Sequence, residues 1–251
     1  MRVLLIVAYD GSGYCGWQIQ PNGITIEQVL NEAISDLFQT PITVTGASRT
    51  DAGVHSLGNV AVFDVDTRMP ADKISFALNQ RLPDDIVVQA SCEVPEDFHP
   101  RYEPCSKTYE YKILNRKMPD PTVRKDTYHY YYPLNVEAMN QAASYLVGQH
   151  DFTGLSSVKA QVKSRIRTIY SCKVYKEDDV IHIRITGNGF LYNMVRIIAG
   201  TLIKVGAGEM EPTYMKEIIH GMDRELAGPT APAHGLTMIG IEYDNYDFTF
   251  E

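Results

Sequence analysis

Apolar positions along the chain fall into alternating strand-like and helix-like segments. The continuous apolar run "VLLIVAY" (3–9) predicts a strand. After Pro21 the spacing turns helical, with one apolar face made of Ile26, Val29, Leu30, Ala33, Ile34, Leu37 and Phe38. Two β-branched segments (41–48 and 59–65), a short helix (70–79) and a strand (85–91) follow. The first hundred residues thus predict a β-α-β-β-α-β order, the split ferredoxin-like arrangement.

The second half of the chain predicts much the same order. A strand (107–114) precedes a helix (135–148) whose N-cap is predicted at Asn135 and whose C′ residue is predicted at Gly148. A hairpin (167–176 and 180–187), a strongly apolar helix (190–206) and a closing strand (237–243) complete it. We therefore expect an α+β protein of two ferredoxin-like domains with antiparallel sheets, residues 1–102 and 103–251, and a catalytic cleft between them.

Composition narrows the class of protein. The chain has 251 residues, 44% of them hydrophobic, and a formal net charge of −8. No window approaches the length of a membrane span, and the N-terminal apolar run ends at Asp10 without a small-residue cleavage site. The four cysteines are scattered, with neither a C-x-x-C pair nor a histidine at ligand spacing: Cys15, Cys92, Cys105 and Cys172. We expect a cytoplasmic protein with no membrane association, structural zinc or disulfide framework.

The string "GSGYCG" (11–16) is a literal G-x-G-x-x-G that follows a predicted strand. A dinucleotide loop needs its third glycine in the opening turn of a helix, because the pyrophosphate binds that helix's N-terminal amides. Here Pro21 and Gly23 stand where that helix would run, and the first convincing helix begins only at Thr25, where Gln28 completes a capping-box signature. The string therefore predicts a turn between strand and helix, and no nucleotide cofactor.

The stretch "SRTDAGVHS" (48–56) places several charged or titratable side chains in one predicted loop. It holds Arg49, Asp51 and His55 beside Gly53, a residue that can supply a positive φ in a turn. A plain Asx-type turn accounts for much of this composition. The pairing of arginine with aspartate among small residues also suits a site that another chain approaches closely.

Several motifs together resemble the tRNA pseudouridine synthase A family: "AYDGSGYCGWQ", "ASRTDAGVHSLGNVAVF", "DFHPRY", "KTYEYKI" and "GNGFLYNMVRIIAGTLIKVG". The resemblance runs in order from about Tyr9 to Gly235. It implies isomerisation of uridine to pseudouridine at positions 38 to 40 of the tRNA anticodon stem-loop. It also implies a homodimer of two-domain subunits that uses no cofactor or metal.

The resemblance places the chemistry on Asp51, which matches the family's catalytic aspartate. Breaking the N1–C1′ bond of uridine and rejoining the base through C5 calls for a carboxylate as nucleophile or electrostatic stabiliser. Burial disfavours an ionised aspartate, and a neighbouring arginine favours it. Arg49 and Arg196 are the candidates, and by resemblance Arg196 pairs with the aspartate across the cleft.

Further substrate contacts follow from the same resemblance. Tyr109 matches the family's substrate-contacting tyrosine, although alternation along the strand fits Tyr111 equally well. An aromatic face of this kind can hold a base extruded from the stem. His55 is interpreted as RNA-contacting or structural.

Charge also supports an RNA partner. Residues 101–176 carry thirteen Lys or Arg against six Asp or Glu, within an acidic chain. The basic residues in predicted loops and strand ends are Arg116, Lys117, Arg124, Lys125, Lys159, Lys163, Arg165 and Arg167. The segments "DFHPRY" (97–102) and "KSRIRT" (163–168) resemble family segments that touch tRNA, which adds Phe98, Arg101 and Arg165 as substrate contacts.

Two other functions are open from the residues. One is a catalytically inactive RNA-binding protein of the same fold, because this fold class hosts many RNA binders. The other is a nucleoside hydrolase or glycosidase, which would need a second carboxylate as acid; none stands beside Asp51 in sequence.

Overall fold

The computed structural model describes residues 1–158 and 163–248. The chain divides into two compact units, one of residues 1–105 and 238–251 and the other of residues 106–237. Each unit combines helices with a mostly antiparallel sheet, so the protein is of the α+β class.

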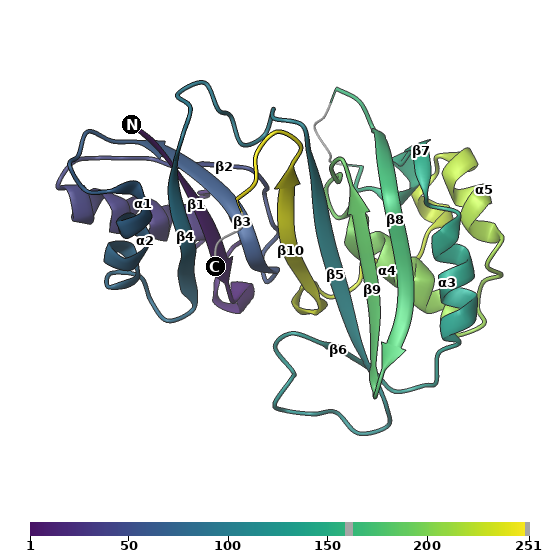
Figure 1. The fold of residues 1–251 in the computed structure, drawn as a ribbon. Coiled ribbons are helices and arrows are strands. Elements are labelled where there is room, and N and C mark those ends of the chain that lie inside the picture. Colours follow the sequence, from purple (N-terminus) through teal and green to yellow (C-terminus); the bar gives the residue numbers. More distant parts are fainter. Residues whose placement is uncertain (159–162, 249–251) are drawn as a thin grey trace. The chain divides into compact units, whose positions relative to one another are not determined.

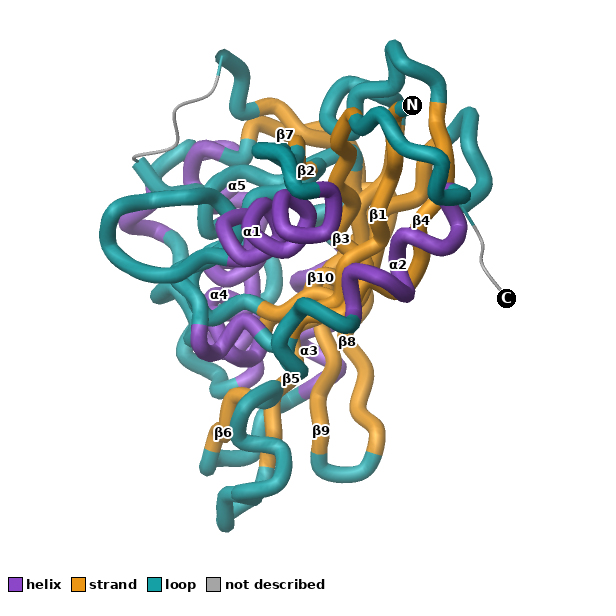
Figure 2. The backbone as a smooth tube through the Cα atoms, turned by 90° about the vertical axis from the view of Figure 1, so that its left-hand side faces the viewer, coloured by secondary structure: helices purple, strands orange, loops and turns teal. Residues whose placement is uncertain are grey.

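Unit 1 contains a sheet whose strands run in the order β4-β1-β3, with the short β2 also paired to β3. The strands are β1 (Arg2–Tyr9), β2 (Thr45–Gly46), β3 (His55–Asp64) and β4 (Ile86–Val94). Helices α1 (Ile26–Phe38) and α2 (Ala71–Asn79) lie together on one face of this sheet (Figures 1 and 2). The predicted order of strands and helices is therefore present in this unit.

Both faces of the unit 1 sheet are buried, and β1 shows why its sequence is continuously apolar. Val3, Leu5 and Val7 pack in the cluster beneath the helices. Leu4 packs on the opposite face, in a second cluster that contains Phe98. A strand covered on both sides needs apolar residues at successive positions instead of alternation.

The strand predicted over residues 41–48 is reduced to the two residues of β2. The N–H of Ile42 donates to Ser35 Oγ and that of Val44 donates to Asn31 Oδ1. These donors are consequently used by side chains of α1 and not by a neighbouring strand. The start of α1 matches its prediction, since Thr25 is the N-cap and its side chain accepts from the N–H of Gln28.

Unit 2 contains strands in the order β5-β9-β8-β7, and β6 pairs in parallel with the end of β5. The strands are β5 (Cys105–Asn115), β6 (Tyr128–Tyr130), β7 (Gly148–Asp151), β8 (Ile166–Glu177) and β9 (Val180–Gly187). The helices are α3 (Val136–Ser144), α4 (Met194–Gly206) and α5 (Tyr214–Gly221), and they lie on one side of β8 and β9 (Figure 1). Asn135 caps α3 as predicted, with its side chain accepting from the N–H of Ala138.

Two predicted helix boundaries in unit 2 were wrong. Helix α4 begins at Met194 and not at residue 190, because Asn193 has a left-handed backbone conformation with φ +60°. Helix α3 ends at Ser144, so Gly148 is not its C′ residue; it opens β7 with φ +114°.

The last strand, β10 (Leu236–Tyr243), lies next to β3, and residues from Met238 onward belong to unit 1. The sequence pattern assigned this segment to the second half of the chain. Tyr243 anchors it in unit 1, because its ring meets Phe98 edge-on at 5.3 Å and its hydroxyl donates to Pro100 O.

Candidate active site

Asp51 opens a tight turn that leads into β3. The N–H of Val54 donates to the carbonyl oxygen of Asp51 at 3.1 Å, and Gly53 has φ +78°. A positive φ at the third position of such a turn favours glycine, as the sequence predicted. The Asp51 side chain is half-buried. The turn fixes the backbone of the predicted catalytic residue.

The "GSGYCG" segment packs directly against this turn. A Cβ on Gly11 would lie 2.0 Å from Val54 O, and one on Gly16 would lie 2.6 Å from Thr50 O. Gly16 also has φ +84°. The two glycines therefore allow two backbone segments to touch, with Gly16 supplying a left-handed conformation as well. Their role is structural support for the Asp51 turn, consistent with the predicted absence of a nucleotide loop.

Hydrogen bonds join the two segments at several points. The N–H of Trp17 donates to Thr50 O at 3.1 Å, and the N–H of Gly53 donates to Tyr14 O at 3.3 Å. The hydroxyls of Tyr9 and Thr50 are 2.8 Å apart. Residues on both sides of Asp51 are thus fixed to the segment 9–17.

His55 belongs to the same support and is buried, with 7% of its surface exposed. Its Nδ1 accepts from the N–H of Gly11 at 3.2 Å and lies 3.2 Å from Asp10 Oδ1. Of the two interpretations left open by the sequence, this placement favours the structural one.

Arg49 and Arg101 are cations on the surface of unit 1, and the guanidinium of Arg101 is partly buried. Arg101 Nε donates to Gly46 O at 2.6 Å, which ties this guanidinium to the strand just before the Asp51 loop. Burial, and then the nearby positive charge of Arg49, lowers the pKa of Arg101.

Phe98 does not have the predicted role of a substrate contact. Its side chain is 1% exposed and meets the rings of Tyr243, Tyr246 and Phe248 edge-on, at 5.3, 5.0 and 5.9 Å. A ring enclosed in this way has no face left for a ligand. Phe98 is a core residue that anchors the segment carrying Arg101.

The surroundings of Tyr109 and Tyr111 in unit 2 distinguish these two residues, which the alternation along the strand could not do. Tyr111 is fully buried and donates its hydroxyl to Pro232 O at 2.9 Å. Tyr109 lies two residues nearer the start of β5, is 8% exposed and packs edge-on against Phe190 at 5.1 Å. Tyr111 is accordingly a core residue, and Tyr109 stays the predicted substrate contact.

Arg196 lies in the first turn of α4 and is partly buried. Its Nε donates to Ala231 O at 2.8 Å and its Nη1 donates to Asn193 Oδ1 at 3.1 Å. These two bonds hold the guanidinium in a fixed orientation. Such a side chain does not extend along the helix surface into solvent.

Two arginines of the basic segment 163–168 in unit 2 form hydrogen bonds within the protein. Arg165 donates to Ser156 Oγ at 3.3 Å and to Val158 O at 3.2 Å. Arg167 donates to the carbonyls of Ser164 and Ile166. Lys159 lies outside the described residues. The predicted RNA contacts of this segment stay predictions.

The predicted site residues are thus divided between the units. Arg49, Asp51, His55 and Arg101 belong to unit 1, whereas Tyr109, Arg165 and Arg196 belong to unit 2. The pairing of Asp51 with Arg196 stays a prediction.

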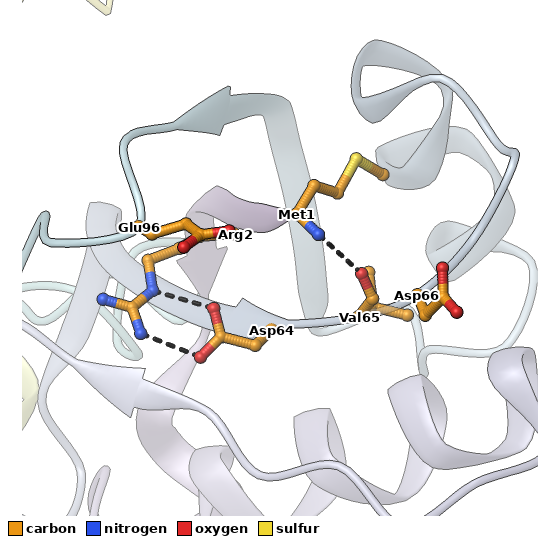
Figure 3. A pocket seen from close by; sticks show the side chains of 6 residues that line it. All are labelled: Met1, Arg2, Asp64, Val65, Asp66 and Glu96. Carbon is orange, nitrogen blue, oxygen red and sulfur yellow. Dashed lines mark hydrogen bonds and ion pairs between the residues drawn. The ribbon is translucent and has the colours of Figure 1, made fainter.

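A pocket of about 510 Å³ lies at the other end of the β1–β3 pair from His55 (Figure 3). It is lined by Met1, Arg2, Asp64, Val65, Asp66 and Glu96. Arg2 forms two hydrogen bonds of 2.8 Å with the carboxylate of Asp64. Arg2 and Tyr9 are seven positions apart along the strand, roughly 23 Å. The pocket is therefore remote from the Asp51 turn.

Within residues 1–158 and 163–248, no three His, Cys, Asp or Glu side chains are grouped so that they could hold a metal ion. The described helices include none that is long and apolar enough to cross a membrane.

Comparison with known proteins identifies the family. A model of the tRNA pseudouridine synthase family matches residues 5–103 and 142–244, which include the Asp51 turn, its glycine support and Arg196. The chain belongs to the tRNA pseudouridine synthase family. The residues between the two matched ranges, 104–141, contain β5, β6 and the first part of α3.

Full-length relatives of this synthase family agree. The chain is 49% identical over 243 residues to a tRNA pseudouridine synthase A of Ruminiclostridium cellulolyticum, covering 96% of this chain and 99% of that one. It is 48% identical to a relative of the same name in Thermoanaerobacter sp., over 96% of this chain and 99% of that one. The relative of this name in Bacillus velezensis is 43% identical, over 98% of this chain and 100% of that one.

The sequence did not reveal that Gly11 and Gly16 support the Asp51 turn. It indicated a turn at "GSGYCG" but did not connect Gly11 and Gly16 to the Asp51 loop, some 40 residues later. The repeated glycines were the available signal, since closely approaching backbones need them.

Proposed function

We propose that this chain isomerises uridine to pseudouridine in tRNA, at positions 38 to 40 of the anticodon stem-loop, with Asp51 as the nucleophile and without a cofactor. The observation that carries the proposal is the Asp51 turn. A half-buried carboxylate stands on a backbone fixed by the segment 9–17, in a chain of the tRNA pseudouridine synthase family. Fixed placement of a nucleophile lowers the entropic part of the barrier.

The reaction conserves all atoms of the nucleoside. The N1–C1′ bond breaks, the uracil turns, and a C5–C1′ bond forms; the hydrogen of C5 is then released and N1 takes a proton. Asp51 acts in its ionised form, either by bonding to the sugar or the base or by removing a ribose proton. We assign Arg196 to keep that carboxylate charged and Tyr109 to hold the extruded base, because a fixed guanidinium and an aromatic ring suit those tasks.

We infer two ferredoxin-like domains from the separate units. In unit 1 the order β4-β1-β3, with β2 paired to β3 and two helices on one face of the sheet, supports this assignment. In unit 2 a helix (α3), a hairpin (β8 and β9) and a second helix (α4) follow in this order along the chain, and β9 pairs with β5. This arrangement supports the assignment as well. A homodimer and a cytoplasmic location complete the proposal, in keeping with the family.

The test is tritium release from unmodified tRNA labelled at C5 of uridine. We expect the wild type and the control Asp72→Asn, an exposed carboxylate on α2, to release tritium equally. Asp51→Asn should release none while binding tRNA within a few-fold of the wild type. If no tRNA that binds the wild type releases tritium, the inactive RNA-binding protein becomes the better description. Residual release by Asp51→Asn above a few per cent would contradict the catalytic role of Asp51.

A further inference from the structure

Asn193 begins α4 differently from the residues that begin α1 and α3. Those two helices start at residues with extended backbones whose side chains accept a backbone N–H, Thr25 with φ −127° and Asn135 with φ −81°. Asn193 instead has φ +60°, and its side chain forms no cap bond with the N–H groups of α4, a helix that the structure describes in full. An asparagine at this position ordinarily caps its helix, so a left-handed one that does not cap calls for a reason.

The Asn193 side chain is bonded to an arginine instead. Its Oδ1 accepts from Nη1 of Arg196 at 3.1 Å, while its carbonyl oxygen accepts from the N–H of Ile197 at 2.9 Å. An N-cap asparagine in the usual extended conformation directs its Oδ1 at backbone N–H groups of the first turn. Asn193 bonds to the side chain of a first-turn residue and not to the backbone of that turn.

The second acceptor of Arg196 lies on a backbone segment that is packed against α4, residues 229–231. Ala231 is 3% exposed; its carbonyl accepts from Nε of Arg196 at 2.8 Å, and its N–H donates to Arg196 O at 3.1 Å. The same segment touches α4 one turn further along, because a Cβ on Gly200 would lie 1.8 Å from Pro229 O. The position of the Ala231 carbonyl relative to α4 is therefore fixed by the backbone.

Acceptors on two different nitrogens fix a guanidinium more completely than one acceptor does. The bond at Nε sets the direction of the group, and the bond at Nη1 sets the rotation of its plane. An arginine held in this way loses less rotamer freedom when it pairs with an anion. Ala231 contributes a backbone oxygen, which nearly any residue could supply. Asn193 contributes a side-chain oxygen, so its identity matters.

We propose that Asn193 is a positioning residue for Arg196, whose guanidinium it orients through Oδ1 from a left-handed backbone. The proposal rests on the proposed function, in which Arg196 keeps the Asp51 carboxylate charged. Asn193 acts through Arg196 and is not itself catalytic. The position calls for a residue that tolerates φ +60° and carries an acceptor two bonds beyond Cβ, and besides asparagine the neutral form of histidine meets both requirements.

The first variant separates the side chain from the backbone. Asn193→Gly keeps the left-handed conformation without steric strain and removes the acceptor. We expect its single-turnover rate of tritium release at saturating tRNA to fall about 10- to 100-fold, as for the loss of one hydrogen bond to a charged group. The Kd for tRNA should stay within twofold, and the urea midpoint should change little.

Met222→Gly is the matched control. Met222 is an exposed residue of the same unit with φ +52°, so this variant makes the same exchange of a left-handed residue for glycine away from Arg196. Its single-turnover rate should equal that of the wild type.

A second variant gives a readout that a merely structural role would not change. In Asn193→His the imidazole Nδ1 takes the place of Oδ1. At about pH 8 the ring is neutral and can accept, so most of the lost rate should return. At about pH 5.5 the ring is protonated, can only donate and repels the guanidinium. The rate of Asn193→His relative to the wild type at the same pH should therefore fall at the lower pH.

The outcomes distinguish the positioning role from the proposed function. If the wild type releases tritium and Asn193→Gly does so at a rate within twofold, the positioning role is overturned and the isomerase stands. The role is also overturned if Asn193→Gly loses stability along with rate and Asn193→His has the same relative rate at both pH values. A raised Kd for tRNA in Asn193→Gly at an unchanged single-turnover rate would show that Asn193 binds RNA, and would overturn the role as well.

NMR of the free protein covers the case in which the wild type releases no tritium and the proposed function fails. The nitrogen signals of the Arg196 Nη groups, assigned by their absence in Arg196→Ala, report rotation about the Cζ–Nε bond. Rotation should be faster in Asn193→Gly than in the wild type, because one restraining hydrogen bond is lost. This result would support the orienting contact without its task in catalysis, whereas equal rates of rotation would overturn it.

Discussion

Gly16 and Thr50 are in backbone contact: a Cβ on Gly16 would lie 2.6 Å from the carbonyl oxygen of Thr50. This contact joins the turn after β1 to the residue directly before Asp51. Because Gly16 also has φ +84°, no other residue fits here without strain. The relationship explains why a glycine-rich turn stands so early in the chain of this synthase.

Gly16→Ala should therefore disturb the site. The left-handed conformation, which alanine disfavours, should lower the free energy of unfolding by about 1–3 kcal/mol. The clash of the new Cβ with Thr50 O should lower it further. Turnover should fall more than stability predicts, since the Asp51 backbone must move. Urea unfolding and tritium release measure the two effects. Gly13→Ala is the matched control, because Gly13 lies in the same turn with nothing within 4 Å of its Cβ position; a similar loss there would contradict the explanation.

His55→Ala should leave the N–H of Gly11 without its acceptor. A buried unpaired donor costs about 1–3 kcal/mol of unfolding free energy. We expect turnover to fall while tRNA affinity stays within twofold, and His55→Asn to restore part of both losses by offering an oxygen acceptor. A tenfold weaker tRNA affinity at unchanged stability would instead show that His55 binds RNA.

The two tyrosines of β5 should respond differently. Tyr111→Phe removes the hydroxyl that donates to Pro232 O and should lower the unfolding free energy by about 0.5–1.5 kcal/mol with unchanged turnover. Tyr109→Leu should mainly reduce turnover. Single-turnover kinetics and urea unfolding on both variants test this assignment, which would be wrong if the effects were exchanged.

Arg196→Ala should reduce turnover strongly, and Arg196→Lys should recover little of it. A lysine cannot reproduce the fixed fork that bonds to Ala231 O and Asn193 Oδ1. Single-turnover rates at saturating tRNA give the measurement. Activity equal to wild type in Arg196→Ala would exclude the proposed pairing with Asp51.

Asp64 provides a pH-dependent contribution to stability. The hydrogen bond from Arg2 holds the pKa of Asp64 below its ordinary value. A lowered folded-state pKa stabilises the protein above the unfolded value of about 4, and this stability is lost as the pH falls through the folded value. Because the pair is exposed, Asp64→Asn should cost at most about 1 kcal/mol at pH 7.

The difference between wild type and Asp64→Asn should shrink as the pH is lowered from 4 toward 2. Thermal unfolding across this range measures it. A difference that stays constant down to pH 2 would show that the Arg2–Asp64 ion pair is not its source.

The sequence by itself determined the local features of this protein. The period of apolar positions specified the helices and most strands, because side chains on one face of an element recur at its own repeat. Thr25 and Asn135 marked helix starts through hydrogen bonds that span three residues. The glycine turn and the positive φ of Gly53 were likewise local properties of the backbone.

Only the tertiary structure decided which of these features meet. Nothing in "DFHPRY" separates a core phenylalanine from an exposed tyrosine, yet Phe98 is enclosed by rings from residues 243–248 while Tyr102 is open to solvent. The same holds for Tyr111, whose partner Pro232 lies 121 residues away, and for β10, which lies beside β3 of unit 1. Periodicity records which face of an element is apolar, but not which distant segment covers it. That information resides in contacts between residues far apart in the chain.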